Sequence, residues 1–135
     1  MNNFDHILAS LMIRSETLEL SSISKLLNTN ATRSHLKGEL MSRRNPHSQK
    51  YEKNLWILES KVEKKDDIYE HLANLLKFIE NNLDKLNGIV NQCEFEISLG
   101  IFIKGENAGF YLDKDIMQRL NKIPIELFFD IYFNE

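Results

Sequence analysis

The sequence predicts an α+β domain in which helices cover one face of a mainly antiparallel sheet. Two segments near the C-terminus, residues 93–104 and 123–135, alternate apolar side chains with others along their length. A period of two predicts strands that each have one apolar face. Residues 68–90 repeat apolar side chains at the helical period and predict a long helix, with Asn81-Asn82 as a point where it can bend or split.

Shorter signals predict the other elements. Strands are expected, in chain order, at residues 6–14, 32–36, 55–60, 93–104, 110–113 and 123–135. Helices are expected at residues 18–28, 68–90 and 114–122. Ser21 or Ser22 is expected to cap the first helix, and Asp113 the last. A polar, irregular loop is expected at residues 37–53.

The order of these elements is β-α-β-β-α-β followed by β-α-β. The first six match the ferredoxin-like arrangement, in which both helices cover one face of an antiparallel sheet. The last three predict a C-terminal β-α-β addition. One core is expected between the sheet and the long helix, formed by Phe95, Leu99, Ile125, Leu127, Ile131, Leu72, Leu75, Leu76 and Ile79.

Short motifs along the chain carry a family resemblance. They are Lys37-Gly38-Glu39, the segment Trp56–Ser60, and the closing segments Gly109–Leu112 and Asp130–Tyr132. Together with the order of elements, they resemble the bacterial domain-of-unknown-function 4279 family, which implies a small ferredoxin-like domain. The resemblance covers nearly the whole chain and implies no catalytic residues. It also implies a setting beside bacterial toxins, and hence an immunity protein.

Length and composition predict one globular domain, residues 1–135. The net charge of -3 argues against a nucleic-acid-binding protein, because such proteins carry a basic excess. Cys93 is the only cysteine, so no intrachain disulfide is expected. The first residues lack a secretory-signal pattern, and no apolar run is long enough to cross a membrane. We therefore expect a cytoplasmic protein that binds neither nucleic acid nor membrane.

No catalytic or metal-binding motif stands out in the sequence. The histidines His6, His35, His47 and His71 lack the spacing of paired metal ligands, and Cys93 has no C-x-x-C partner. Cys93 is expected to be a buried structural thiol. Glycine-rich phosphate loops are also missing from the sequence. We therefore expect a protein that is not an enzyme and that uses no metal or cofactor.

The second faces of the two C-terminal strands form the predicted site. They combine carboxylates with aromatic side chains, without a cation between Glu94 and Ile103 or in the last strand. The predicted partner-binding residues are Glu94, Glu96, Phe102, Glu126, Phe128, Asp130 and Tyr132. Aromatic anchors among carboxylates suit a basic protein better than phosphate. Two alternatives stay open: the aromatic side chains could pack under the C-terminal addition, or form a homodimer.

The sequence thus predicts a protein-binding domain. The leading interpretation is an immunity protein that binds and neutralises a cognate basic toxin, such as a nuclease. The alternative is a small-ligand-binding or regulatory module of a bacterial cytoplasmic pathway, which would need a concave pocket lined by Trp56 and tyrosine side chains. The loop at residues 37–53 carries Arg43 and Arg44 and is interpreted as a solvated basic loop.

Overall fold

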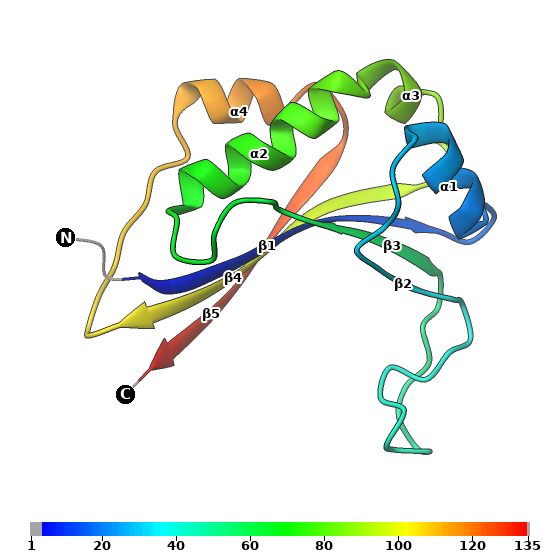
Figure 1. Ribbon diagram of the computed structural model, residues 1–135, viewed down its shortest axis with the longest axis horizontal. Coiled ribbons are helices and arrows are strands. Elements are labelled where there is room, and N and C mark those ends of the chain that lie inside the picture. The colour runs from blue at the N-terminus through cyan, green and yellow to red at the C-terminus, as the bar shows by residue number, and fades with distance from the viewer. Residues whose placement is uncertain (1–3, 135) are drawn as a thin grey trace.

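A computed structural model describes residues 4–134 of the chain. Within them, five strands form one open sheet, and four helices lie on one side of it (Figure 1). The strands are β1 (Phe4–Ser15), β2 (Arg33–His35), β3 (Asn54–Glu59), β4 (Glu94–Lys104) and β5 (Ile125–Asn134). The helices are α1 (Leu20–Leu27), α2 (Ile68–Asn81), α3 (Leu83–Asn87) and α4 (Lys114–Leu120). The fold is a mixed α+β domain, as the sequence predicts.

The strands lie side by side in the order β2-β3-β1-β4-β5. The pairs β2–β3, β3–β1 and β1–β4 are antiparallel, whereas β5 runs parallel to β4. A parallel neighbour needs a crossover connection, and the chain between β4 and β5, which contains α4, provides it on the helix side of the sheet (Figure 1). The expectation of a mainly antiparallel sheet therefore holds for every pair except the last.

The predicted strand at residues 110–113 does not form. This segment has no regular secondary structure and pairs with no strand of the sheet. Phe110 instead packs near Phe4 of β1 and Phe129 of β5, with ring centroids 6.2 and 5.7 Å away. Its apolar side chain thus covers the sheet rather than extending it. The expected β-α-β addition is reduced to α4 and β5.

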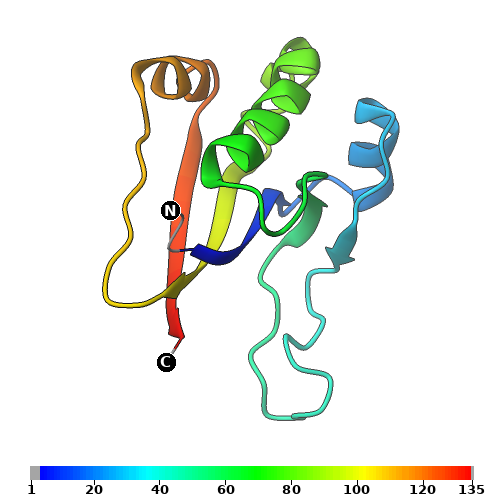
Figure 2. The same cartoon turned by 60° about the vertical axis from the view of Figure 1, so that its left-hand side comes forward.

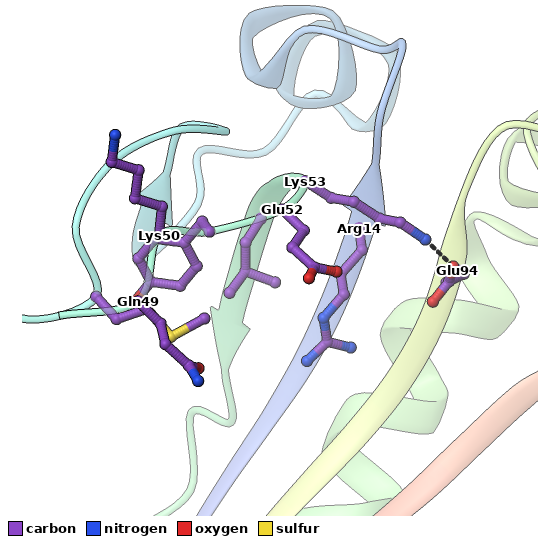
Figure 3. Close-up of a pocket in the computed structure, with 9 residues that line it drawn as sticks. Arg14, Gln49, Lys50, Glu52, Lys53 and Glu94 are labelled. Carbon is purple, nitrogen blue, oxygen red and sulfur yellow. Dashed lines mark hydrogen bonds and ion pairs between the residues drawn. The ribbon is translucent and has the colours of Figure 1, made fainter.

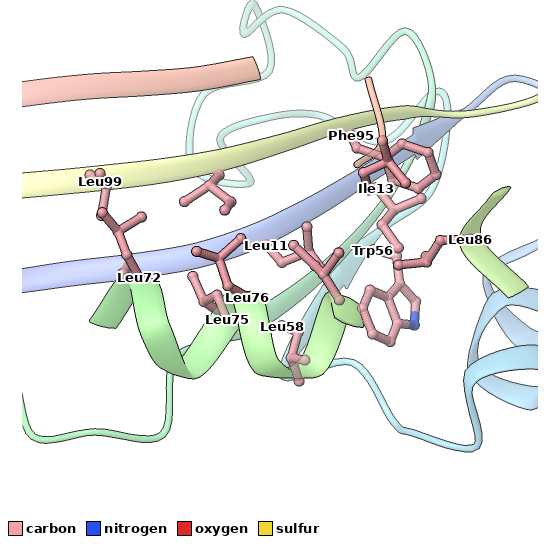
Figure 4. Close-up of a cluster of buried hydrophobic side chains, with 14 of the residues drawn as sticks. Leu11, Ile13, Trp56, Leu58, Leu72, Leu75, Leu76, Leu86, Phe95 and Leu99 are labelled. Carbon is pink, nitrogen blue, oxygen red and sulfur yellow. The ribbon is translucent and has the colours of Figure 1, made fainter. Parts of the chain in front are cut away.

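The hydrophobic core lies between the sheet and α2 (Figure 4). Leu72 and Leu76 of α2 are fully buried, as are Leu11 of β1 and Leu99 of β4. Most of the predicted core residues are buried, and Ile125 and Leu127 are partly buried against them. The expectation that Ile131 belongs to the core is wrong, because this residue of the edge strand β5 is 45% exposed. The C-terminal end of β5 extends away from the helices (Figure 1).

Side chains at the helix ends agree with part of the prediction. Asp113 caps α4, because its carboxylate accepts a hydrogen bond from the backbone N–H three residues later. Asn82 separates α2 from α3, so the long helix splits where two asparagines interrupt it. The expected serine cap of α1 was wrong: the helix starts after Glu19, and neither Ser21 nor Ser22 caps it.

Residues 36–53 form an arm that projects from the sheet on the side away from the helices (Figures 1 and 2). Backbone N–H groups of Gly38 and Met41 donate to the carbonyls of Tyr51 and Gln49, each at 2.8 Å. Gly38 has a φ of 91°, a value that favours glycine. The loop expected at residues 37–53 is therefore a paired, hairpin-like arm.

Candidate functional site

All the predicted partner-binding residues lie on one face of the sheet. In the parallel register of β4 and β5, Glu96 is beside Glu126, and Phe102 is beside Tyr132. The residues that alternate with them, such as Phe95, point into the core. We call the face away from the helices the open face. Its members on β1, β4 and β5 are His6, Leu8, Ser10, Met12, Arg14, Glu94, Glu96, Ser98, Gly100, Phe102, Glu126, Phe128, Asp130 and Tyr132.

Three stacked rings cross the open face. The imidazole of His6 stacks on Phe102, with centroids 3.9 Å apart, and Phe102 stacks on Tyr132 at 4.7 Å. These side chains come from β1, β4 and β5, so one row joins three strands. A register shift between Phe4 and His6 precedes the pairing of His6 with Phe102. The sequence prediction missed His6, because the alternation within β1 does not show that this strand lies beside β4.

The aromatic side chains of β5 remain accessible. Phe128 is 52% exposed and Tyr132 is 45% exposed. Packing under the C-terminal addition was one interpretation of these residues, but α4 lies on the opposite side of the sheet (Figure 1). The Tyr132 hydroxyl donates a hydrogen bond to Asp130, which raises the pKa of Tyr132 because the neighbouring carboxylate disfavours a phenolate.

The charges of the open face are more mixed than the strand sequences indicate. Arg14 of β1 reaches Glu96, with Nη1 and Oε1 3.2 Å apart, and Lys53 of the arm pairs with Glu94. The hydrogen bond from Lys53 lowers the pKa of Glu94. Among residues 4–134, Glu126 and Asp130 form no ion pair. The unbalanced negative charge therefore lies on β5.

A pocket of about 520 Å³ lies where the arm meets the open face (Figure 3). Arg14, Leu55 and Glu94 line it from the sheet, and the arm contributes Met41 and residues 49–53. Tyr51, one of these arm residues, stacks on His35 of β2, with centroids 4.4 Å apart. The sequence prediction missed this pocket, because it depends on how the arm folds back over the sheet.

Trp56 does not line an open pocket. Its side chain is fully buried, and its indole Nε1 donates to Ser24 of α1 at 2.9 Å. The expectation that Trp56 lines the pocket of a small-ligand-binding module is therefore wrong. The tyrosine part of that expectation agrees with Tyr51.

The comparisons with known proteins give one positive result. The family model for a domain of unknown function, DUF4279, matches residues 4–134. The chain belongs to the DUF4279 family. Neither a curated protein nor a solved structure matches it.

Two residues of the short motifs noted in the sequence, Gly38 and Trp56, have structural roles. Gly38 occupies a backbone conformation that other residues rarely adopt, at the start of the arm. Trp56 fills the core between β3 and α1. These residues therefore support the fold of this chain and leave its activity open.

Titratable side chains also lie outside the open face. Ser60 Oγ and His71 Nδ1 are 2.6 Å apart, but the imidazole is buried, and burial lowers its pKa. Cys93 was expected to be buried, but it is only partly buried against the core. This partial burial raises the pKa of its thiol, which favours the protonated form. Residues 4–134 contain no group of three or more His, Cys, Asp or Glu side chains placed to hold a metal ion.

Every helix in this range is too short or too polar to span a bilayer.

Proposed function

We propose that this DUF4279 protein is a non-enzymatic binding domain that acts as an immunity protein and neutralises a cognate bacterial toxin. One observation carries the proposal: Phe128 and Tyr132 are about half exposed, at 52% and 45%, on a sheet face that no helix covers. Exposed aromatic side chains with low conformational freedom are typical anchors of protein interfaces. An inhibitor needs no chemistry of its own, because covering the toxin's active site is sufficient.

The charges favour a basic partner. Glu126 and Asp130 flank Phe128 on the same strand and lack ion pairs within residues 4–134. Carboxylates around an aromatic anchor speed the encounter with a basic protein, such as a nuclease, and disfavour phosphate. Glu94 and Glu96 are already paired with Lys53 and Arg14, so we expect them to contribute less. The proposed contact therefore centres on β5.

The experiment measures binding to the protein encoded beside this gene, which is the first candidate toxin. The double change Glu126→Lys and Asp130→Lys should slow association, because charges at the rim act on encounter. Phe128→Ala should mainly speed dissociation, as the loss of an anchor does. Tyr69→Ala changes an exposed aromatic residue on α2 and is the matched control.

Two results would contradict the proposal. One is unchanged binding in every open-face variant, combined with loss of binding in the arm variant Arg43→Glu, Arg44→Glu. That pattern would indicate an acidic partner at the arm. The other is failure of the protein to protect cells that produce the neighbouring toxin. We place the protein in the bacterial cytoplasm, where such protection is needed.

We also infer that β1 to β4, with α1 and α2, form a ferredoxin-like unit to which α4 and β5 are added. The antiparallel order β2-β3-β1-β4 and the helices on one face support this inference. Superposition of these elements on ferredoxin-like domains tests it. Strands that superpose only after their order is permuted would contradict it.

A second candidate function is small-ligand binding at the arm. The pocket of about 520 Å³ is large enough for a small metabolite, and Arg14, Lys50 and Glu52 offer charges of both signs. A zwitterionic ligand such as an amino acid fits this chemistry. Thermal stabilisation by amino acids in the wild type, but not in Tyr51→Ala, would favour this function over toxin binding.

A further inference from the structure

The two edges of the sheet differ strongly. The β2 edge is only three residues long and polar, with the sequence Arg33-Ser34-His35. The β5 edge is ten residues long and rich in aromatic and aliphatic side chains. Within residues 4–134, no backbone hydrogen bond joins the outer edge of β5 to another segment. Proteins usually blunt such edges with charge, proline or a covering segment, so a long apolar edge indicates a strand that pairs with another chain.

On the helix side of the sheet, β5 has exposed apolar side chains at its C-terminal end and lies beside a groove at its N-terminal end. Near the C-terminal end, Phe133 is 67% exposed and Ile131 is 45% exposed. Near the start of the strand, an apolar groove of about 560 Å³ lies between α4 and β5. It is lined by Leu112, Met117, Gln118, Leu120, Asn121, Ile123, Pro124, Ile125 and Leu127. Phe133, Ile131, Ile125 and Leu127 share one face of the strand, because all pair beside core residues of β4.

We propose that β5 pairs with β5 of a second copy of this chain, antiparallel and centred on Phe129. In this register Phe133 of one copy lies opposite Ile125 of the other, at the apolar groove. Ile131 likewise lies opposite Leu127. Because the arrangement is two-fold symmetric, each copy fills the groove of its partner. One strand thus provides both the exposed side chains and the surface that buries them.

The carboxylates of the open face are compatible with this register and disfavour the two nearest alternatives on the same face. Centring on Phe129 places Glu126 opposite Tyr132, and Phe128 opposite Asp130, so no two like charges face each other. Centring on Phe128 would place Glu126 opposite Asp130, and centring on Asp130 would place that carboxylate opposite itself. Like charges directly across a strand pair are destabilising.

Centring on Leu127 also keeps the carboxylates apart, but it leaves Phe133 outside the paired part of β5. Centring on Ile131 keeps them apart as well, but it is the weaker register. It leaves the N-terminal part of β5 unpaired and moves Phe133 opposite Phe129, away from the groove beside Ile125. The Phe129-centred register uses almost the whole strand, which runs from Ile125 to Asn134. Pairing at the edge leaves the open faces of both copies accessible, so this inference does not depend on the proposed function.

The first test measures the mass of the full chain alone by sedimentation across a concentration series. We expect a dimer at about 100 μM, well above the Kd of a micromolar interface. Phe133→Glu and Met117→Lys should each weaken the dimer at least about tenfold. Both residues are exposed in the monomer, so circular dichroism and melting of the variants should match the wild type. Tyr69→Glu on α2 is the matched control and should leave the dimer unchanged.

The second test determines the register by disulfide cross-linking in a Cys93→Ser background. A chain with Glu126→Cys should cross-link to a chain with Tyr132→Cys, and neither should cross-link to itself. A cross-link between Asp130→Cys and Tyr132→Cys chains instead would overturn the Phe129-centred register. A chain that stays monomeric at about 100 μM, or a dimer that survives both Phe133→Glu and Met117→Lys, would overturn the pairing itself. Protection of β5 amides only when a different protein is added would also overturn it, because the occupant of the edge would then be that protein's strand.

Discussion

Arg119 of α4 binds both carboxylate oxygens of Glu80 on α2. Its Nε lies 3.0 Å from Oε2, and its Nη2 lies 2.8 Å from Oε1. The contact joins the crossover helix to the helix that covers the centre of the sheet (Figure 1). A parallel strand can be added to β4 only if the crossover returns along the sheet. The Arg119–Glu80 pair therefore helps to fix the position of α4, and with it the start of β5.

Removing this pair should destabilise the fold modestly. Arg119→Ala should lower the free energy of unfolding by about 1 kcal/mol, because the ion pair is bidentate but partly exposed to solvent. Arg119→Lys keeps the charge and loses the fork geometry, so an intermediate loss is expected. Denaturant melts of the variants and the wild type measure both values. No loss in Arg119→Lys would show that the fork geometry is unimportant, whereas a loss as large as in Arg119→Ala would show that the charge alone contributes nothing.

The same pair should make stability sensitive to acid. The hydrogen bond from Arg119 lowers the pKa of Glu80 below its ordinary value of 4.5. A carboxylate with a lowered folded pKa stabilises the fold above its unfolded pKa and loses this effect as pH falls through the folded value. The difference in unfolding free energy between wild type and Arg119→Ala should therefore shrink below about pH 4.5. A constant difference down to strongly acidic pH would contradict this assignment.

The core should respond to cavity formation. Leu99→Ala and Leu76→Ala should each cost about 2–5 kcal/mol, because both side chains are fully buried. Leu36→Ala makes the same chemical change in the arm, where Leu36 is 53% exposed, and is the matched control. Denaturant melts should show little loss for the control. Similar small losses in all three variants would mean that the assigned core face is wrong.

The sequence was most informative where one residue pattern decides one structural feature. Alternation placed Phe102, Phe128 and Tyr132 on a common face because a strand has a period of two. Asp113 was recognised as a cap because its carboxylate acts on a backbone N–H only three residues away. Such features depend on neighbours within the same segment.

The errors involve segments far apart in the chain. Alternation in β5 gave no information on its neighbour, so the parallel pairing with β4 and the exposure of Ile131 at the sheet edge were missed. The charge of the open face was misjudged for a related reason. Arg14 reaches Glu96 from β1, and Lys53 reaches Glu94 from the arm, and only the tertiary structure brings these pairs together. Non-local pairing cannot be read from the periodicity of one segment.

The contact between Trp56 and Ser24 should be measurable as a coupling energy. Ser24→Ala leaves the buried indole N–H without its partner, which should cost about 1–3 kcal/mol. In a Trp56→Phe background the ring has no N–H, so the same serine change should cost much less. Ser21→Ala, at an exposed position of the same helix, is the control. Equal losses from Ser24→Ala in both backgrounds would show that the hydrogen bond contributes nothing.

His71 should make stability fall between neutral and mildly acidic pH. Its side chain is almost fully buried, beside Ser60, and burial lowers its pKa, although Asp66 and Asp67 partly oppose this. The unfolded chain therefore binds a proton at a pH where the folded chain does not, so the unfolding free energy falls as pH drops below about 6.5. His71→Gln cannot titrate, and its stability should change less between about pH 7.5 and 5.5.

The control for this measurement is His47→Gln, in the exposed arm, which should keep the pH dependence of the wild type. The comparison uses the slope of stability with pH rather than its absolute value, because His71→Gln also changes the packing around Ser60. Linkage ties that slope to the difference in bound protons between the unfolded and folded chains. If wild type and His71→Gln show the same slope, the buried imidazole is not the group that destabilises the fold in mild acid.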